Sequence, residues 1–390
     1  MHSRTNDLKG RIHPPSVGEF RVCFFPGRLD LGGIGRVIQH LATEMIGRGV
    51  EVDLFLLEGS GRLESELPEG LRIFRGGRTT KSSVMPFLRY LRREQPQVVV
   101  SARDQLNLAS LLAVRLTSKK IRHISTVHTT YEYLEAKREE YTLKQRLWHK
   151  WVHVAGRISY RWADQIVAVS EGVAIDFSRK FAIPKEQIEV IYNPAYNPAS
   201  VVKNGGIKSK EETLPPHIVG VGRLTFQKDF RTLVRAFDLV RREVPEAYLT
   251  IYGEGEERGA LESLIANLEL GECVSLPGYI PDVASKLVDA DVFVLSSRYE
   301  GFGVVLVEAL AAGLPVVSTD CKSGPAEILG NGRWGHLVGV GEVDEMAEAI
   351  LTSLETDVDG QSQRDRASAF ATPVVTDRYL RIMFPEWEGG

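Results

Sequence analysis

Cysteine is scarce in this 390-residue sequence, and its scarcity limits what the chain can be. The three cysteines, Cys23, Cys273 and Cys321, are far apart and odd in number. This excludes a disulfide framework within one chain and a cysteine-based zinc site of known spacing. We therefore expect a reducing, cytoplasmic location.

Long apolar runs are also missing. No run reaches the roughly 18 residues that a membrane-spanning helix requires. The first 19 residues are polar and lack the apolar segment of a signal peptide, so residues 1–19 are expected to form a flexible tail. No tandem short repeat or low-complexity tract is visible.

A strong net charge is absent as well, because the formal charge is −3. The charge is nevertheless uneven: residues 1–195 hold 30 Lys and Arg against 21 Asp and Glu, and the remainder holds 18 against 30. A basic half joined to an acidic half suggests a different partner for each. Drift in surface composition is the alternative interpretation.

Short Val-, Ile- and Leu-rich runs alternate with helical patterns along the whole chain, which is typical of an α/β fold. Runs without polar alternation fit strands that are buried on both faces of a parallel sheet. The expected strands are 20–25, 50–57, 97–102, 121–127, 165–170 and 188–192 in the first half, and 217–222, 247–253, 273–278, 291–297, 315–319 and 336–340 in the second.

Residues 193–216, rich in Pro, Asn, Gly and Lys, interrupt this alternation. The sequence thus predicts two Rossmann-like domains whose parallel sheets face each other across a ligand-binding cleft. The expected division is an N-terminal Rossmann-like domain over 20–195, a linker over 196–216, a C-terminal Rossmann-like domain over 217–370, and a final helix within 371–390.

Two strand ends carry features suited to an anionic ligand. Gly32, Gly33 and Gly35 follow the first strand and open a helix, whose free N–H groups attract anions. Arg223 and Lys228 follow the first strand of the second half, on the ligand side of an open sheet. Arginine can bind a diphosphate in a bidentate manner and lysine adds a mobile charge, whereas an ordinary solvated loop is the alternative.

Glu308 lies on a helical pattern, 303-GVVLVEALAAG-313, that is otherwise apolar on nearly every face. A carboxylate there costs on the order of several kcal/mol unless it is hydrogen-bonded. Glu308 is about 1.5 turns from the helix start, within reach of a ligand, and could accept hydrogen bonds from ribose hydroxyls. Glu300, in the preceding loop, could accept from the hydroxyls of a second group. A satisfied structural glutamate is the alternative for Glu308.

Two other patterns are decoys. The segment 289-DAD-291 resembles a metal-binding signature, but Asp291 opens a buried strand and Asp289 ends a helix, so we expect no metal site. The segment 253-GEGEERG-259 lacks the dinucleotide-binding spacing and is too acidic for a pyrophosphate.

The region 291-DVFVLSSRYEGFGVVLVEALAAGLPVVSTDCKSGPAEIL-329 strongly resembles the donor site of family 4 glycosyltransferases, which have the GT-B fold. The hallmark is a pair of glutamates, Glu300 and Glu308, separated by seven residues. Further matches are 222-GRLTFQKD-229, 252-YGEGEERGALE-262, 276-LPGYIPDV-283, 31-LGGIGR-36 and 126-TVHTT-130. The resemblance runs from Phe20 onward and is more specific in the second half. It implies that the domain over 20–195 binds the acceptor, that the domain over 217–370 binds the nucleotide-sugar, and that the final helix within 371–390 packs back on the first domain.

The resemblance implies a role for each matching residue. Arg223 and Lys228 would bind the donor diphosphate, Glu308 the ribose, and Glu300 the transferred sugar. His128 would contact the donor sugar or the transfer site. The expected catalytic residues are Glu300, Arg223, Lys228 and His128. The expected donor-binding residues are Gly33, Gly222, Arg223, Lys228, Gly278, Tyr279, Glu300, Phe302, Gly303, Val304 and Glu308.

The resemblance also implies a retaining reaction without a metal or other cofactor. Cys321, Lys322, Gly324, Pro325 and Glu327 match members that use UDP-hexoses or UDP-N-acetylhexosamines, so we expect a UDP-sugar donor, although the family includes GDP-sugar users. The expected acceptor is a glycan or lipid-linked saccharide in cell-surface polysaccharide or lipopolysaccharide assembly, and nucleic acid is not expected as a partner. A nucleotide-sugar 2-epimerase of the same fold and a non-catalytic two-lobed sugar-binding protein are the alternatives.

The basic half contains a long helical pattern over residues 137–164. One apolar stripe is expected to pack on the sheet, and its members are Leu143, Leu147, Trp151, Val154, Ile158 and Trp162. Tyr141, Lys144, Trp148 and His149 lie off this stripe. They could contact an anionic membrane at its inner face, which would make the protein peripheral.

Overall fold

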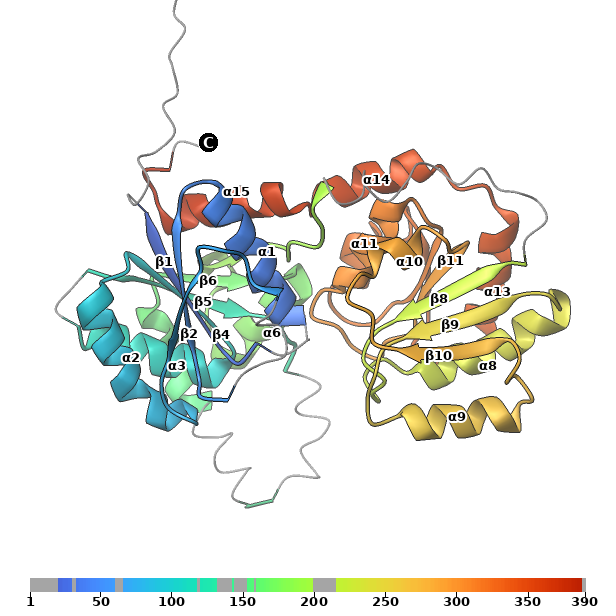
Figure 1. Ribbon diagram of the computed structural model, residues 1–390, viewed down its shortest axis with the longest axis horizontal. Coiled ribbons are helices and arrows are strands. Elements are labelled where there is room, and N and C mark those ends of the chain that lie inside the picture. Colours follow the sequence, from blue (N-terminus) through green and yellow to red (C-terminus); the bar gives the residue numbers. More distant parts are fainter. Residues whose placement is uncertain are drawn as a thin grey trace, which may run out of the picture.

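The computed structural model describes residues 20–29, 33–59, 66–117, 120–131, 142–143, 153–157, 159–198 and 215–387. These residues form two lobes, each built around one parallel sheet (Figure 1). The first sheet has seven strands in the order β3-β2-β1-β4-β5-β6-β7, and the second has six in the order β10-β9-β8-β11-β12-β13. The chain therefore has the predicted architecture of two Rossmann-like domains.

The first lobe alternates strands with helices. Its strands are β1 (Arg21–Gly27), β2 (Glu51–Leu56), β3 (Arg72–Arg75), β4 (Val98–Ala102), β5 (Arg122–Val127), β6 (Gln165–Ala168) and β7 (Ile188–Val190). Its helices are α1 (Gly33–Gly47), α2 (Thr80–Glu94), α3 (Asp104–Arg115) and α6 (Glu171–Phe181), with 3-10 turns η3 (Tyr160–Trp162) and η4 (Lys185–Gln187).

The second lobe repeats this alternation. Its strands are β8 (His217–Val221), β9 (Tyr248–Tyr252), β10 (Val274–Gly278), β11 (Val292–Leu295), β12 (Val316–Thr319) and β13 (His336–Val338). Its helices are α8 (Phe230–Glu243), α9 (Arg258–Asn267), α10 (Ala284–Leu287), α11 (Val304–Ala312), α12 (Pro325–Ile328), α13 (Val343–Glu355) and α14 (Gly360–Ser368). Helix α15 (Thr372–Met383) follows them.

All twelve strands expected from the sequence are present, and β3 is an addition. Its sequence, Arg-Ile-Phe-Arg, is short and mostly exposed at the sheet edge, so it lacks the apolar run that marks the buried strands. Arg72 of β3 is paired with Asp53 of β2, a carboxylate that is fully buried within the sheet. Backbone pairing with β2 and this ion pair, and not a hydrophobic run, thus hold the edge strand.

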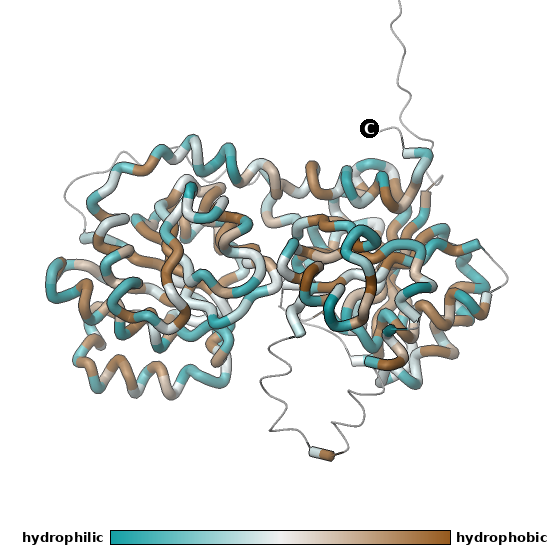
Figure 2. Tube along the Cα trace, turned by 180° about the vertical axis from the view of Figure 1, so that it is seen from behind, coloured by the Kyte–Doolittle hydropathy of each residue, from teal (hydrophilic) through white to brown (hydrophobic). Residues whose placement is uncertain are grey.

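Buried apolar residues of the strands and of the helices packed on them form a core in each lobe. Hydrophobic residues are brown on the Cα trace in Figure 2. In the first sheet Val98, Val99 and Val100 are all buried, because helices cover both faces. Burial on both faces explains why these strands read as continuous apolar runs instead of alternating ones.

The chain crosses between the lobes twice, and the two crossings lie side by side. Ala195 donates its N–H to the Phe370 carbonyl at 3.1 Å, and Thr372 donates to the Tyr196 carbonyl at 2.9 Å. Before the second crossing α14 lies over the second lobe, and after it α15 lies over the first (Figure 1). The aromatic ring of Phe384, just after α15, contacts that of Phe20 at 4.7 Å between centroids. The C-terminal helix is thus part of the core of the first lobe.

The predicted packing of the stripe in residues 137–164 is wrong for the members that the structure describes. Leu143, Val154 and Trp162 are 74%, 58% and 52% exposed. The opposite face is buried: Tyr160 lies against Phe177, and Gly156 lies where any Cβ would overlap a phenylalanine ring. A glycine without a side chain allows this close approach, and the hydrophobic periodicity does not register it.

Some predictions fall outside the described residues. These are the flexible tail over 1–19, most of the linker over 196–216, and the proposed membrane-contact side chains Tyr141, Lys144, Trp148 and His149. Within the described part of the chain, every helix is too short or too polar to cross a bilayer.

Candidate functional site

Two loops at the carboxyl edge of the second sheet bring the predicted donor-site residues together. One loop follows β8 and carries Lys228; the other follows the neighbouring strand β11 and carries Glu300. The Lys228 ammonium binds the Glu300 carboxylate at 2.5 Å, and the Ser297 hydroxyl donates to the same oxygen at 2.7 Å. Glu300 is buried, with 7% exposure, so its charge is held by these two donors.

A set of hydrogen bonds fastens these two loops to each other. The Ser296 hydroxyl donates to the Lys228 carbonyl at 2.8 Å, and the Gln227 amide donates to the Tyr299 carbonyl at 2.9 Å. The Arg298 guanidinium pairs with the Asp229 carboxylate at 2.8 Å. The ion pair links the residue after Lys228 to a residue two positions before Glu300, so it fixes the relative position of the two functional side chains.

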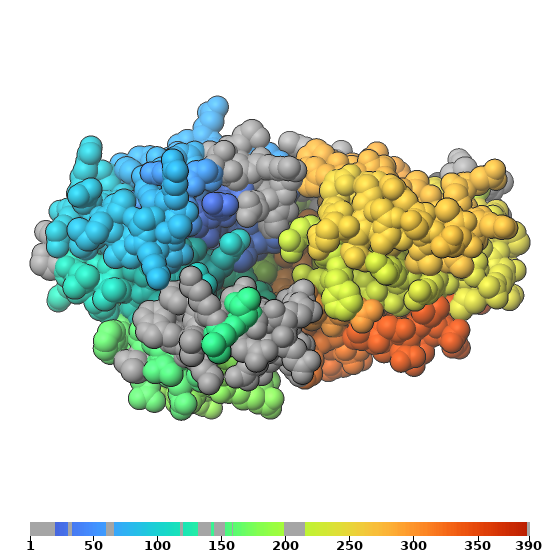
Figure 3. Space-filling model, turned by 90° about the horizontal axis from the view of Figure 1, so that it is seen from below, coloured from blue at the N-terminus to red at the C-terminus, as the bar shows by residue number. Residues whose placement is uncertain are grey.

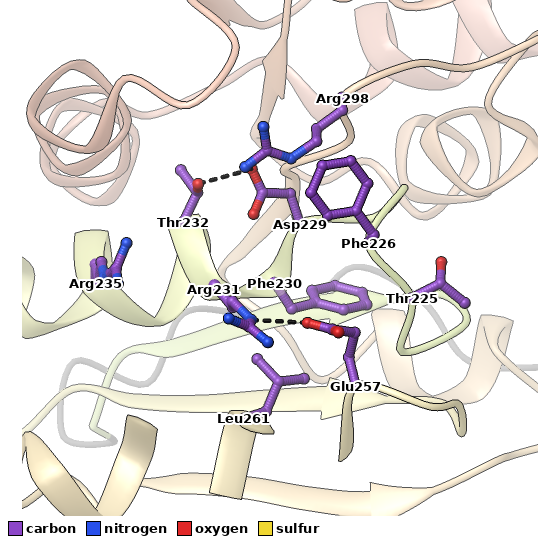
Figure 4. Close-up of a pocket in the computed structure, with 10 residues that line it drawn as sticks. All are labelled: Thr225, Phe226, Asp229, Phe230, Arg231, Thr232, Arg235, Glu257, Leu261 and Arg298. Atoms are coloured by element: carbon purple, nitrogen blue, oxygen red, sulfur yellow. Dashed lines mark hydrogen bonds and ion pairs between the residues drawn. The ribbon is translucent and has the colours of Figure 1, made fainter. Parts of the chain in front are cut away.

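A pocket of about 260 Å³ lies beside this ion pair (Figure 4). Its walls are Thr225, Phe226, Asp229, Phe230, Arg231, Thr232, Arg235, Glu257, Leu261 and Arg298. The Arg298 guanidinium lies over the Phe226 ring at 4.5 Å from its centroid. None of the residues predicted for the donor site lines this pocket, so it is separate from the Lys228–Glu300 pair.

Glu308 differs from Glu300 in its hydrogen bonding. It lies on α11 and is half-buried, and among the described residues nothing donates a hydrogen bond to its carboxylate. Burial raises the pKa of Glu308 to about 7; the positive charge of Arg36 lowers it, and the negative charge of Asp282 adds to the rise. A partly buried carboxylate without a donor is costly, which favours a ligand over a purely structural role.

Arg223 follows β8 and is exposed, and no carboxylate in the described part of the chain pairs with it. Its neighbour Gly222 lies under Lys228, because a Cβ there would come within 3.1 Å of the lysine side chain. The edge of the second sheet thus presents an unpaired cation, Arg223, and an unpaired carboxylate, Glu308. The Lys228–Glu300 pair belongs to the same edge.

Glycines shape the loop that leads into α11. Gly303, at the start of the helix, has a φ of +101°, which only glycine adopts without strain. Gly324 lies so close to Phe302 that a Cβ would be 1.9 Å from its carbonyl oxygen. The Phe302 ring is buried against Tyr192 of the first lobe, at 5.4 Å between centroids. Val304, the first residue of α11, is half-buried.

The first lobe approaches this loop through His128, which follows β5. A Cβ on Gly301 would lie 2.0 Å from the His128 carbonyl oxygen, so the two lobes touch beside Glu300. The His128 ring lies 2.9 Å from the Thr126 hydroxyl. Burial, followed by the charge of Arg103, lowers the pKa of His128 to about 4, so the imidazole is neutral at pH 7. This histidine can form hydrogen bonds, but it is not a cation.

Further contacts join the lobes around the same place. Glu327, in α12, accepts hydrogen bonds from the amides of Glu171 and Gly172 at 2.8 and 2.9 Å, at the start of α6. The Ser170 hydroxyl donates to the Gly301 carbonyl at 2.8 Å. Seen from below, the surface is hollowed where the lobes meet (Figure 3).

Arg36, on α1, is a site residue that the sequence did not single out. It donates to the Tyr279 hydroxyl at 2.8 Å and to the Pro281 carbonyl at 3.1 Å, and it pairs with Glu66 at 3.3 Å. It also acts on the pKa of Glu308 from the opposite lobe. It directly follows Gly35 of the glycine cluster, but nothing in its own segment indicates a partner more than 200 residues away.

The remaining predicted positions are near these groups. Gly278 ends β10 with a φ of +97° and lies next to the partly exposed Tyr279. Gly33 opens α1, and a Cβ there would meet no described atom within 4 Å, so open space lies at the helix start.

In 289-DAD-291, the Asp291 carboxylate accepts from the His217 amide at 2.8 Å. No metal-binding cluster of acidic, histidine and cysteine side chains is found among the described residues.

Family models match both halves of the chain. The model "Glycosyltransferase Family 4" matches residues 31–195, and "Glycosyl transferases group 1" matches residues 207–372. Together these matches cover every strand of both sheets except β1, and every loop described above.

Two curated relatives illustrate the similarity. The N-acetylgalactosamine-N,N'-diacetylbacillosaminyl-diphospho-undecaprenol 4-alpha-N-acetylgalactosaminyltransferase of Campylobacter jejuni is 33% identical over 214 residues, which are 54% of this chain and 56% of that protein. The lipopolysaccharide core biosynthesis glycosyltransferase LpsE of Rhizobium meliloti is 32% identical over 233 residues, 58% of this chain and 66% of that protein. The chain thus spans between half and two thirds of the length of these relatives.

Solved structures share the fold over nearly the whole chain. The lipopolysaccharide outer core galactosyltransferase WaaB superimposes with a TM-score of 0.72 at 20% identity, covering 94% of this chain and 100% of that one. HepE of Anabaena, solved in complex with UDP, superimposes with a TM-score of 0.74 at 18% identity, covering 93% and 99%.

Proposed function

The chain belongs to the family 4 glycosyltransferases with the GT-B fold, and on that premise we propose that it transfers a sugar from a UDP-sugar. The transferred group is a hexosyl or N-acetylhexosaminyl residue, and the acceptor is a glycan or lipid-linked saccharide in cell-surface polysaccharide assembly. The observation that carries the proposal is the edge of the second sheet. It presents a cation and a carboxylate that no described residue pairs with, Arg223 and Glu308, together with the ion pair of Lys228 and Glu300.

This arrangement matches the charges of a nucleotide-sugar. Arg223 binds the diphosphate, and Lys228 adds a second charge, because its ammonium keeps further N–H donors while it holds Glu300. Glu308 accepts from the ribose hydroxyls, which replace the missing protein donors. Glu300, next to the contact between the lobes, binds the transferred sugar, and the neutral His128 binds near the same place.

The proposed reaction keeps the anomeric configuration. The acceptor hydroxyl attacks the sugar carbon on the face from which the diphosphate departs, and an oxygen of that diphosphate takes the proton. Arg223 and Lys228 stabilise the charge that develops on the leaving group. The new glycosidic bond forms as the bond to the diphosphate breaks, so nucleoside diphosphate is released.

The choice of donor and acceptor is supported by the similar proteins. HepE was solved with UDP, and also with UDP-glucose. The name of the Campylobacter jejuni relative describes an acceptor that is a diphospho-undecaprenol saccharide, and LpsE acts in lipopolysaccharide core biosynthesis. A lipid-linked acceptor would bring the protein to the inner face of the membrane as a peripheral enzyme.

Mass spectrometry of reaction mixtures tests this function. Purified protein is incubated with a panel of UDP- and GDP-sugars, with and without extracted lipid-linked saccharides or glycans. A glycosyltransferase yields a product heavier by one sugar only when acceptor is present. Release of nucleotide and an altered sugar without acceptor would instead identify an epimerase. Binding of sugar without any turnover would identify a non-catalytic sugar-binding protein.

The reaction is expected to need no metal, since Arg223 and Lys228 supply the positive charge at the diphosphate. Transfer activity should therefore be unchanged in excess EDTA. Loss of activity on chelation, with recovery on addition of manganese, would contradict the assignment of these two side chains and direct attention back to 289-DAD-291.

A further inference from the structure

Three neighbouring strands of the first sheet end in basic residues. Arg28 follows β1, Arg103 follows β4 and His128 follows β5, and the strand order places β4 between β1 and β5. Phe25 is paired with Ser101, and Ala102 with Thr126, so the strands end at the same level of the sheet edge. Adjacent strands are about 4.8 Å apart, which puts Arg103 between Arg28 and His128.

This edge faces the second lobe. The His128 carbonyl lies against Gly301, the residue that follows Glu300. Arg103 is close enough to His128 for its charge to contribute to the low pKa of that ring. An anion held by Arg103 would therefore lie near the place where the transferred sugar is bound.

The two arginines are not neutralised within the described part of the chain. Arg28 and Arg103 are exposed, and no described acceptor forms an ion pair with either guanidinium. Asp104, which follows Arg103 in the chain, has other partners. Its carboxyl group accepts hydrogen bonds from the Tyr131 and Tyr160 hydroxyls, and burial raises its pKa.

The backbone at Arg103 is strained. Its φ of +79° and ψ of +136° are a combination that residues other than glycine rarely adopt. Such strain persists where the surrounding structure enforces it, and it is concentrated at functional sites. The strain orients a side chain whose guanidinium group no described residue pairs with, so stability alone does not account for an arginine at this position.

We propose that Arg103, assisted by Arg28, binds a phosphate or diphosphate group of the acceptor. This inference rests on the proposed function and names the chemistry of its acceptor: a saccharide joined to its carrier through phosphate. The donor diphosphate has its own cations, Arg223 and Lys228, on the opposite lobe. A second cationic site across the contact between the lobes therefore fits a second anionic group, which arginine can bind in a bidentate manner.

The direct test uses inorganic pyrophosphate as the probe. The full-length protein is first saturated with UDP, so that the donor site is filled, and pyrophosphate is then titrated by calorimetry. Arg103→Gln is expected to weaken pyrophosphate binding roughly tenfold or more, because a charged hydrogen bond is lost. Arg28→Gln is expected to show a smaller loss, and the UDP affinity of both variants should stay within about twofold of the parent.

Two further variants control for folding and for surface charge. Arg103→Gly removes the guanidinium but accommodates the positive φ, so its melting temperature should not fall while its pyrophosphate affinity does. Arg92→Gln changes an exposed arginine near the end of α2, a helix that leads to the start of β4 at the opposite edge of the sheet. Its pyrophosphate affinity should equal that of the parent protein.

Three results would overturn the proposal. The parent protein, saturated with UDP, could fail to bind pyrophosphate. Arg103→Gln could bind it as tightly as Arg92→Gln. A parallel loss of UDP affinity in Arg103→Gln would assign the arginine to the donor diphosphate instead. These titrations require no turnover, so they distinguish failure of this site from failure of the proposed sugar transfer.

Discussion

At the residue scale, the two glutamates of the donor site differ in how the protein satisfies them. Glu300 is buried and held by Lys228 and Ser297, whereas Glu308 has no described donor. Glu308→Gln is expected to weaken UDP binding roughly 10- to 150-fold, because a charged hydrogen bond to the ribose is lost. Glu300→Gln should leave UDP affinity nearly intact and reduce turnover instead. Calorimetry with UDP separates the two effects.

Glu308→Gln and Glu300→Gln serve as controls for each other, since both replace a carboxylate by an amide of the same size. Equal losses of UDP affinity in the two variants would contradict the division of labour. Unchanged UDP affinity in Glu308→Gln, together with a lower melting temperature, would make Glu308 a structural residue.

The raised pKa of Glu308, about 7, gives a pH dependence with a definite sign. The ionised form accepts from the ribose, so UDP affinity should be full above pH 7 and decline as the pH falls through 7. The stability of the ligand-free protein depends on pH in the opposite direction. Because the pKa of Glu308 is higher in the folded protein than in the unfolded chain, its contribution to the free energy of unfolding decreases as the pH rises from about 4.5 to 7.

Measurements at pH 6 and pH 8 test both statements. The UDP affinity of the parent protein should be higher at pH 8, and that of Glu308→Gln should change less between the two values. The melting temperature of ligand-free Glu308→Gln at pH 8 should equal or exceed that of the parent. A clear decrease would show that the carboxylate stabilises the fold.

At the element scale, the loops after β8 and β11 act as one unit because they are fastened to each other. Asp229 is buried and pairs with Arg298 (Figure 4). Asp229 directly follows Lys228 in the chain, and Arg298 lies two positions before Glu300. Asp229→Asn keeps the size of the side chain and tolerates its left-handed backbone, with a φ of 45°, but it removes the charge. Turnover should fall roughly tenfold or more, since small displacements of catalytic groups are costly.

A double-mutant cycle with Arg298→Gln identifies the cause. If the ion pair positions Lys228 and Glu300, the double variant should lose no more turnover than Asp229→Asn alone. Additive losses would mean that the two residues act independently. The effect is expected in kcat more than in KM, whereas general destabilisation would lower the melting temperature in proportion to the loss.

At the scale of the whole molecule, the contact between the lobes depends on Gly301, the residue that follows Glu300. A Cβ at Gly301 would lie 2.0 Å from the His128 carbonyl oxygen, closer than any real contact allows. Gly301→Ala should therefore hold the lobes apart: the radius of gyration in small-angle scattering should rise, and sugar transfer should fall. UDP should still bind, because most of its proposed contacts are on the second lobe.

Gly259→Ala is the matched control, since a Cβ at that position on α9 meets no atom within 4 Å. It should leave scattering and activity unchanged. If Gly301→Ala retained both the compact shape and full transfer, the contact between His128 and Gly301 would not be needed for activity.

Much of this molecule could be predicted from the sequence. Continuous apolar runs indicated strands covered on both faces, and those runs marked twelve of the strands because burial on two sides leaves no polar alternation. The edge strand β3 was not predicted, because its residues are mostly exposed and form no apolar run. Its ion pair with Asp53 leaves no periodic pattern of hydrophobic residues in the sequence. The prediction that the apolar stripe of residues 137–164 packs on the sheet was wrong for its described members. Gly156, which has no side chain and so adds nothing to the hydrophobic pattern, lies on the face that packs against Phe181.

For the candidate site, the sequence by itself determined which residue types follow each strand. The carboxyl ends of parallel strands share one edge, so Arg223, Lys228, Glu300 and Glu308 could be grouped before any coordinates were known. The folded structure was needed to show that Glu300 is paired with Lys228, whereas no described residue pairs with Arg223 or Glu308. It alone also brought Arg36 to Tyr279 and His128 to Gly301, because contacts between lobes depend on how two separately folded sheets dock. That docking is set by surface shape and not by local sequence pattern.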